Sequence, residues 1–582
     1  MTGAPSTLIA MNYRCSFLFL TLTVACTTPV LADTLTVLNN ADSGAGSLRN
    51  AIDTASSGDT IDFGAGLNGQ TIRLTTGQLL VDIDLTIDAA ALSNGITISG
   101  DADGSGTPTS GDSRIFQVDA GNTVTMYNLT MRDGATADAA PDTTSDPGGG
   151  ILNAGDLTLI DCIVTHCRTG DGEDSANASI AKGGSAGNGG GIYNDAAGAL
   201  TLLRTRITFN NTGSGGDADG LGTADITVGG DGGIGGGIYN GGSLSISQST
   251  ISDNTCGDAG DSINGRGLGD AFGETGWGGG IANFISNQAL VIEDTTIARN
   301  RTGTLKGDFD GGRGAGIAIV FASSATLTNV TIADNTQPGT LAPVGGGGGI
   351  SVFSTATQIT NCTIVGNRVA GNGGGIEHVG TEETVTLENT IVAGNSTQGE
   401  VATGNDLFGE FAEAGLNFIG DTDGATGLGS PLTGDPKLGP LRDNGGLTET
   451  MNPLIGSPVI DAGIPTGNTP ATDQRGEARP FGDEIDIGAV EYFPSPAPKI
   501  IAPRKVTFRG KRAKIGMSVT GGTDGLLLRV KATGRAKAKV RGGNPYKIIV
   551  KKISKKRIRV KIFATNAANL RAFAKTKAIR KR

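Results

Sequence analysis

Short runs in which apolar and polar residues alternate recur along the chain, separated by Gly and Asn. One run reads Leu244-Ser-Ile-Ser-Gln-Ser-Thr-Ile251 and is followed by Ser-Asp-Asn254. Alternation with a period of two predicts short strands that bury one face, and Gly or Asn between the runs predicts turns. The pattern therefore predicts an all-β protein built from many short strands.

The strands belong to a repeat that opens with a Gly-Gly-Gly-Ile block. The block occurs at Gly148–Ile151, Gly189–Ile192, Gly235–Ile238, Gly278–Ile281, Gly347–Ile350 and Gly373–Ile376, with a variant at Gly314–Ile317. The spacing between blocks shrinks from 46 residues to 26 along the chain, while the strand pattern stays constant. Each repeat is therefore one coil with a variable insertion at one corner, and stacked coils bury a common core.

Asparagine occupies the same place in successive coils. Because Asn tolerates left-handed backbone geometry and stacked amides hydrogen-bond to one another, we expect a structural ladder. Its members are Asn210, Asn254, Asn300, Asn335, Asn367 and Asn395.

These coils resemble right-handed parallel β-helix proteins of the pectate-lyase-like superfamily. The front end, Asp42–Phe63, resembles bacterial surface proteins with a "CSLREA" start, although Gly46 replaces the Cys and Asn50 the Glu. The region from Asp435 to Glu491 resembles the "choice-of-anchor Q" region, which closes such β-helices ahead of varied anchoring modules. The resemblance covers Asp33 to Tyr492 and implies a parallel β-helix (solenoid) at 33–403 and a closing cap at 404–493.

Both ends of the solenoid have residues suited to covering it. Ser47–Ala55 has the apolar spacing of a short amphipathic helix, which would cover the open first coil. Near the other end, carboxylates and a guanidinium gather in a Gly- and Pro-rich stretch, at Asp461, Asp473, Arg475, Asp486 and Glu491. We interpret them as a hydrogen-bonded cap in which Arg475 bonds a carboxylate. The alternative is a catalytic or calcium site.

The amino terminus has the pattern of an export signal. Residues 1–32 contain Arg14, an apolar run from Cys15 to Cys26, and a small-residue cleavage site ending at Ala32. Met11 is a second candidate for the start, and lipidation at Cys26 is the alternative to cleavage. The run is too short to span a bilayer, and no later segment predicts a transmembrane span. We expect a secreted or cell-surface bacterial protein.

Charge and composition change along the chain. The whole protein has 97 Gly among 582 residues, 4% aromatic residues and a net charge of −11. From Lys499 onward there are 27 basic residues and one acidic residue, which leaves 19 basic and 56 acidic residues before it. After a Pro-rich linker at 494–498, alternating apolar and basic strands at 499–582 predict a small basic, immunoglobulin-like β-sandwich domain.

Candidate chemistry is sparse. The best acid–base set is His378 with Glu382 and Glu383 near Glu377, and the best calcium candidates are the loop aspartates Asp217, Asp219, Asp225 and Asp231. The glycine-rich loops that hold these aspartates, Gly170–Gly190, Gly213–Gly236 and Gly257–Gly276, lack a strict calcium-binding repeat, so we expect solvated flexible loops. Two histidines and no Cys-x-x-Cys pair argue against zinc. No cofactor is expected, calcium excepted.

Two functions fit these features. The first is a non-catalytic, adhesin-like surface or matrix protein whose rod displays loops for binding a glycan or another surface. Its basic domain would hold it to a cell-surface or matrix polysaccharide, an anionic envelope polymer or extracellular DNA. The alternative, suggested by the fold of pectate lyases, is a polysaccharide lyase or glycoside hydrolase acting on an acidic polysaccharide, although a fold alone does not establish an activity.

Overall fold

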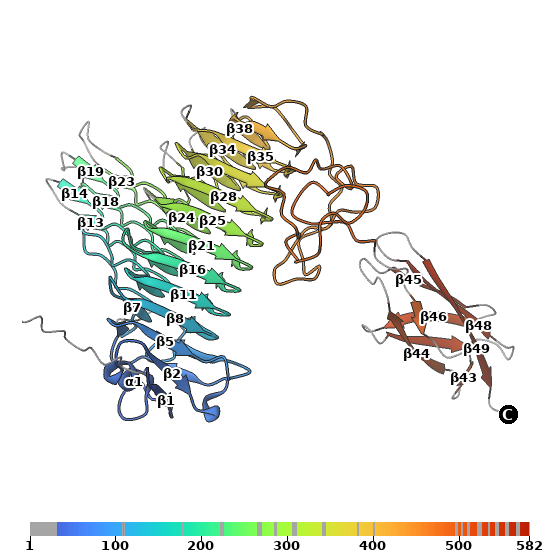
Figure 1. The fold of residues 1–582 in the computed structure, drawn as a ribbon, viewed down its shortest axis with the longest axis horizontal. Coiled ribbons are helices and arrows are strands. Elements are labelled where there is room, and N and C mark those ends of the chain that lie inside the picture. The colour runs from blue at the N-terminus through green and yellow to red at the C-terminus, as the bar shows by residue number, and fades with distance from the viewer. Residues whose placement is uncertain are drawn as a thin grey trace, which may run out of the picture.

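The body of the protein is a stack of coils, seen as a rod in the computed structural model (Figure 1). The structure describes residues 32–494 apart from 107–108, 110, 177–179, 222–225, 265–270, 285–287, 305–310, 340–344, 381–382 and 400–401. Beyond residue 494 it describes the eight strands between residues 499 and 580. The expected export signal therefore lies almost wholly outside the described residues.

Three parallel sheets run the length of the stack, and each coil contributes one strand to each sheet. In seven coils the strand of sheet 1 starts at the Ile of a glycine block. Sheet 1 contains β4 (Leu79–Val81), β7 (Phe116–Val118), β10 (Ile151–Asn153), β15 (Ile192–Asn194), β20 (Ile238–Asn240), β24 (Ile281–Phe284), β27 (Ile317–Val320), β30 (Ile350–Phe353), β34 (Ile376–Val379), β38 (Leu407–Glu410) and β41 (Ala425–Thr426).

Sheet 2 contains β1 (Thr34–Val37), β2 (Asp59–Phe63), β5 (Leu85–Asp88), β8 (Thr123–Tyr127), β11 (Asp156–Ile160), β16 (Ala199–Leu203), β21 (Ser243–Ser247), β25 (Ala289–Glu293), β28 (Ser324–Thr328), β31 (Thr357–Thr360), β35 (Val385–Glu388) and β39 (Ala412–Ala414). Sheet 3 contains β3 (Thr71–Arg73), β6 (Ile96–Ser99), β9 (Leu129–Arg132), β12 (Ile163–Thr165), β17 (Arg206–Thr208), β22 (Thr250–Ser252), β26 (Thr296–Ala298), β29 (Thr331–Ala333), β32 (Thr363–Val365), β36 (Ile391–Ala393) and β40 (Phe418–Ile419).

The expected parallel β-helix is thus confirmed, and its three sheets continue past residue 403 to Thr426. Pairing is in register, so Ile192 of β15 lies beside Ile238 of β20, and each coil adds one more buried layer. Inward-facing Ile, Leu and Val residues from all three sheets form a continuous core. Helix α1 (Leu48–Thr54) lies beside β1 and β4 at the first coils, with Leu48, Ala51 and Ile52 buried. A one-turn helix, η1 (Ala65–Leu67), follows β2.

Buried amides connect the coils where sheet 3 ends. The six asparagines of the sequence-derived ladder lie in one buried column, in which each side-chain amide donates to the next at 2.9–3.0 Å. The column ends on the carboxylate of Asp406. The sequence analysis missed a second column at the end of sheet 1, in which Asn153, Asn194, Asn240 and Asn283 are joined at 2.6–2.7 Å. In both columns, buried side-chain amides that water does not reach find hydrogen-bond partners in the neighbouring coils.

The long insertions form a lateral extension, defined here as residues 170–187, 213–233 and 257–276. Short parallel strands join them: β13 (Ser175–Ala176), β18 (Ala218–Asp219) and β23 (Ser262–Ile263) pair in one set, and β14 (Ile180–Lys182) pairs with β19 (Ile226–Val228). They project from the side of the rod (Figure 1). The expectation of solvated flexible loops is wrong for the described part of these insertions.

Glycine makes the extension compact, because its outgoing and returning segments hydrogen-bond to each other through backbone alone. Gly216 donates to Gly184, Gly230 donates to Gly216, and both N···O distances are 2.9 Å. A Cβ atom built on Gly216 would lie 2.1 Å from the carbonyl oxygen of Glu173. Only a residue without a side chain permits this contact, which explains much of the high glycine content.

Two further strands, β33 (Arg368–Val369) and β37 (Ser396–Thr397), pair beside the last coils. The carboxy-terminal strands form two four-stranded sheets. One contains β42 (Lys499–Ile501), β44 (Arg512–Thr520), β47 (Tyr546–Lys552) and β46 (Ala536–Arg541), and the other contains β43 (Lys505–Phe508), β49 (Arg571–Arg580), β48 (Ile558–Thr565) and β45 (Leu527–Ala532). A small basic β-sandwich-like domain therefore follows the solenoid.

The buried and exposed asparagines at positions 210 and 211 provide a test of the ladder. Asn210→Ala removes an amide that donates to Val164 O and accepts from Cys167 N, both at 3.0 Å. Unsatisfied buried groups cost about 1–3 kcal/mol each, so we expect a loss of about 3 kcal/mol in unfolding free energy in urea. Asn211→Ala alters an exposed side chain one residue away and should cost less than about 0.5 kcal/mol. Equal losses in the two variants would contradict the ladder.

Candidate functional site

The outer surface of sheet 1 carries a row of aromatic rings, called here the aromatic face: Tyr193, Tyr239, Trp277, Phe284 and Phe353. Alternation along the strands places Ile192 and Ile238 in the core and therefore turns Tyr193 and Tyr239 outward. In-register pairing stacks these two rings with centroids 4.7 Å apart and planes 3° apart. The next ring, Phe284 of β24, lies 6.4 Å from Tyr239.

Trp277 extends the row, although it comes from the glycine-rich segment that returns to the rod before β24. Its ring lies edge-on to Phe284 at 5.5 Å and tilted to Phe353 of β30 at 5.9 Å. All five rings of the aromatic face are partly exposed. Burial raises the pKa of Tyr193 to about 12. Its hydroxyl, protonated at neutral pH like that of any tyrosine, can donate a hydrogen bond.

A buried ion pair closes one end of the aromatic face. The guanidinium of Arg313 lies 5.0 Å from the centre of the Phe353 ring and 5.8 Å from that of Trp277. Its Nη1 bonds both carboxylate oxygens of Glu377 at 2.8 and 2.7 Å, and Ser351 donates to the same carboxylate at 2.8 Å. The Arg313 and Glu377 side chains are 13% and 4% exposed, so this pair holds the rings in place rather than meeting solvent.

A cavity of about 260 Å³ adjoins the aromatic face at the base of the lateral extension. Trp277 and Phe284 form its apolar part, and Asp231, Glu274 and Asn188 contribute polar groups. Flat apolar rings beside carboxylate and amide oxygens suit a ligand with C–H faces and hydroxyl groups. The arrangement can bind a sugar by stacking and hydrogen bonding.

The sequence-derived acid–base set is divided in the structure. Glu377 faces outward on sheet 1, whereas His378, the next residue of β34, faces the core and is 5% exposed. His378 Nδ1 donates to the carbonyl oxygen of Glu410 at 2.6 Å, so its proton is on Nδ1 when the ring is neutral. His378 and Glu383 line one small cavity of about 110 Å³, while Glu382 lies outside the described residues.

The described loop aspartates accept hydrogen bonds from residues of the next coil. Asp217 accepts from Asp261 N and Asp231 accepts from Glu274 N, both at 2.8 Å. Asp219 accepts from Asn264 Nδ2 at 3.0 Å, and Asp225 lies outside the described residues. Within the described chain, these residues are not in a group that could hold a metal ion.

One other group of carboxylates has the geometry to hold a cation. Asp101, Asp103 and Asp112 each place an oxygen within 4.8 Å of the others. Asp101 already accepts from the backbone N–H groups of Gly104, Ser105 and Gly106. Arg73 lies 3.6 Å from Asp101, which supplies positive charge to the cluster.

The four cysteines of the described chain, Cys162, Cys167, Cys256 and Cys362, are free and buried. Burial raises the pKa of each thiol to about 12. They contribute to packing, because a protonated buried thiol is neither a nucleophile nor a metal ligand.

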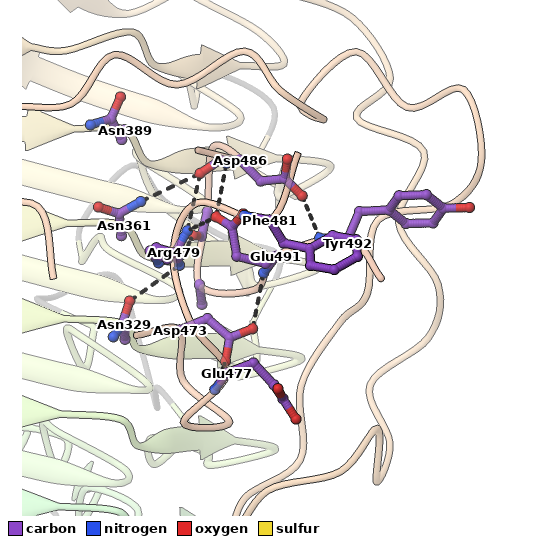
Figure 2. Close-up of polar contacts among 12 residues, drawn as sticks. Asn329, Asn361, Asn389, Asp473, Glu477, Arg479, Phe481, Asp486, Glu491 and Tyr492 are labelled. Atoms are coloured by element: carbon purple, nitrogen blue, oxygen red, sulfur yellow. Dashed lines mark hydrogen bonds and ion pairs between the residues drawn. The ribbon is translucent and has the colours of Figure 1, made fainter. Parts of the chain in front are cut away.

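The five polar residues predicted to cap the solenoid lie in one hydrogen-bonded network on its flank, against the turns between sheets 2 and 3. Figure 2 shows three of them, Asp473, Asp486 and Glu491. Asp473 accepts from Arg475 Nη2 at 2.7 Å and from Glu491 N at 3.0 Å. Asp486 accepts from Asp461 N at 2.7 Å. Asp473, Asp486 and Glu491 are 0% exposed, so no substrate reaches their carboxylates in this structure.

The centre of this network is Arg479, which the sequence analysis did not single out. Its guanidinium donates to Glu491 Oε1 at 2.6 Å, to Gly488 O at 2.8 Å and to Asn329 Oδ1 at 3.2 Å (Figure 2). Asn329 lies in the turn between sheets 2 and 3. Arg479 therefore attaches the segment to the flank of the solenoid, and only the fold brings residues 150 positions apart together.

The stacked sheets make this chain a parallel β-helix protein. Comparison with protein-family profiles, curated proteins and solved structures found no match. Among the described residues, no helix is both long enough and apolar enough to cross a membrane.

Asp294 predicts a pH dependence of stability at the flank. Burial raises its pKa to about 6, above the value of about 3.9 in an unfolded chain. Between these two pH values Asp294 is protonated in the folded state and ionised in the unfolded state. The free energy of unfolding therefore falls as pH rises through this range, and the loss is complete above about pH 6. Asp294→Asn removes that cost and matches Asn329, Asn361 and Asn389, which occupy the same turn in later coils. Its stability relative to the parent should rise from pH 4 to pH 7.5 in urea unfolding.

Asp161 is the matched control, since it occupies the same turn with a positive φ. Its carboxylate bonds Arg204 at 2.7 and 2.8 Å, which lowers its pKa. Asp161→Asn should therefore lose stability relative to the parent only as pH rises toward about 4, and this deficit should stay constant from pH 4 to pH 7.5. The same pH trend in both variants would show that burial does not govern Asp294.

Proposed function

We propose that the protein is an exported surface or matrix protein, adhesin-like and non-catalytic, that binds a polysaccharide along its aromatic face. Its basic carboxy-terminal domain would hold it to an anionic surface. The observation that carries the proposal is the row of partly exposed rings on successive coils, beside a cavity that contains carboxylates.

A repeating polymer matches a repeating surface. Successive coils lie about 4.8 Å apart, so a chain running along the rod meets rings on three successive coils, at Tyr193, Tyr239 and Phe284, of which the first two are paired in register. Aromatic rings lose little conformational entropy on binding because they have only two side-chain torsions. The hydroxyl groups of Tyr193 and Tyr239 and the carboxylates of Asp231 and Glu274 would provide hydrogen bonds to sugar hydroxyls.

The sequence supplies the rest of the proposal. The amino-terminal signal pattern and the resemblance of both ends to bacterial surface proteins favour export and retention at the cell surface. The 27 basic residues from Lys499 onward favour attachment to an anionic envelope polymer, a matrix polysaccharide or extracellular DNA. The same fold makes a polysaccharide lyase or glycoside hydrolase the alternative function.

A polysaccharide titration tests the aromatic face, because Trp277 is the only tryptophan and therefore the only indole reporter. We expect its fluorescence to change on adding at least one of polygalacturonate, alginate, xylan or glucomannan. Tyr239→Ala should weaken that binding about tenfold, the effect of losing about 1.4 kcal/mol. Tyr127→Ala removes a partly exposed tyrosine from sheet 2 and should leave binding unchanged.

Size-exclusion chromatography of the same mixtures, with calcium present, separates binding from catalysis. Intact polymer that elutes with the protein supports the proposal. Shortened polymer would show an enzyme instead, and Glu383→Gln and His378→Asn would then be the first variants to assay. No fluorescence change and no co-elution with any of the four polymers would refute the aromatic face as a polysaccharide site.

Deleting Lys499–Arg582 tests retention. The truncated protein should move from the cell-associated fraction to the medium, because the deletion removes a net charge of +26. A variant with the arginines and lysines of 505–514 changed to Gln keeps the domain and should be released in part, more so as salt increases. Equal cell association of truncated and full-length protein would contradict the anchoring role.

A further inference from the structure

A second surface, away from sheet 1, has features that a purely structural turn does not need. Where sheet 3 ends, one residue takes a left-handed conformation in each of the eight coils from β9 to β36. Most residues at this place are of types that tolerate it, among them Asp133, Asp253, Asp334, Gly366 and Gly394. In β17's coil the residue is Phe209, with φ of 57°.

Phe209 is an unfavourable choice on two counts. A bulky side chain is disfavoured in the left-handed region, where only small or locally hydrogen-bonding residues are at ease. The Phe209 side chain is also 49% exposed, so it does not compensate by filling the core. Residues in strained backbone conformations cluster at functional sites, so Phe209 is a candidate for one. Its ring stacks on exposed His166, the equivalent residue of the preceding coil, at 5.3 Å with planes 22° apart.

The stacked pair borders a cavity of about 340 Å³, a volume within the range of small-molecule sites. Polar groups surround the rest of it: Asp101, Asp112, Arg132, Arg168 and Asn211. The guanidinium of Arg132 is 2.7 Å from Asp133, that of Arg168 is 2.6 Å from Asp171, and Arg73 lies near Asp101. Each arginine is thus matched by a carboxylate, and the lining itself, with three aspartates and two arginines, is slightly negative.

We propose that this cavity binds one neutral sugar residue of a glycan, stacked on Phe209 and His166. The ring face of a pyranose supplies the apolar C–H surface that an aromatic pair takes up. The hydroxyls donate to the carboxylates of Asp101 and Asp112 and accept from the amide of Asn211. A sugar acid is disfavoured, because the arginines already have carboxylate partners and Asp101, Asp112 and Asp133 would repel it.

The site is separate from the aromatic face and does not depend on it. Its residues come from the turns after sheet 3 and from the segment after β6, whereas the aromatic face lies on sheet 1. The protein would thus bind glycans at two places on the rod.

Calorimetry on the mature full-length chain tests the proposal, with neutral hexasaccharides of glucose, mannose, galactose and xylose as probes and hexagalacturonate for comparison. We expect at least one neutral probe to bind, and Phe209→Asn to weaken it tenfold or more. Asn suits the left-handed turn, so the thermal midpoint of this variant should be no lower than that of the parent. A binding loss without a stability loss separates function from misfolding.

Phe321→Asn is the matched control. Phe321 has φ of 55° and is 54% exposed, but it does not line this cavity. Its replacement should leave the affinity unchanged, as should Tyr239→Ala in the aromatic face. Failure of all four neutral probes to bind, binding of hexagalacturonate alone, or equal affinity in Phe209→Asn and the parent would each overturn the proposal. If Tyr239→Ala lost binding and Phe209→Asn did not, the cavity proposal would also be overturned. The polysaccharide function of the aromatic face would then still stand.

Discussion

In-register parallel pairing between successive coils is the constraint on which the rest of this structure depends. It places every residue beside its equivalent in the next coil, as where Ile192, Tyr193 and Asn194 lie beside Ile238, Tyr239 and Asn240. A position is therefore suited to the stack only if its side chain packs well against a copy of itself. Aliphatic residues meet this requirement in the core, aromatic rings meet it on the outside, and amides meet it at the turns because each both donates and accepts.

The same constraint explains where glycine is required. In the lateral extension, outgoing and returning segments of neighbouring coils alternate and bond backbone to backbone, at Gly184, Gly216 and Gly230. Any side chain would enter the adjacent backbone, because the built Cβ contacts there are about 2 Å. The insertions are consequently compact structural elements, and they form part of the wall of the cavity beside the aromatic face.

Departures from the stacked pattern identify the residues with other roles. Phe209 stands where most other coils have Asp or Gly, and Trp277 enters the aromatic face from the extension rather than from a strand. Arg479 is the equivalent departure for the flank, a charged group buried where it joins three carbonyl-type acceptors and Glu491. Burying a guanidinium is costly unless acceptors surround it, and here both terminal nitrogens are bonded, with the solenoid supplying one acceptor through Asn329.

The sequence by itself determined the repeat, the strand positions, the asparagine column and the polar residues of the flanking network, because each follows from short-range periodicity or from residue type. It also indicated the short helix at Ser47–Ala55, from the spacing of its apolar residues. Only the tertiary structure showed the compact glycine packing, the separation of His378 from Glu377, and the rings of Tyr239, Trp277 and Phe353 on one surface. These features depend on how many residues each insertion contains and on which coil lies beside which. Spacing along the chain cannot supply that information, because contacts between coils join residues that are some 30 to 150 positions apart.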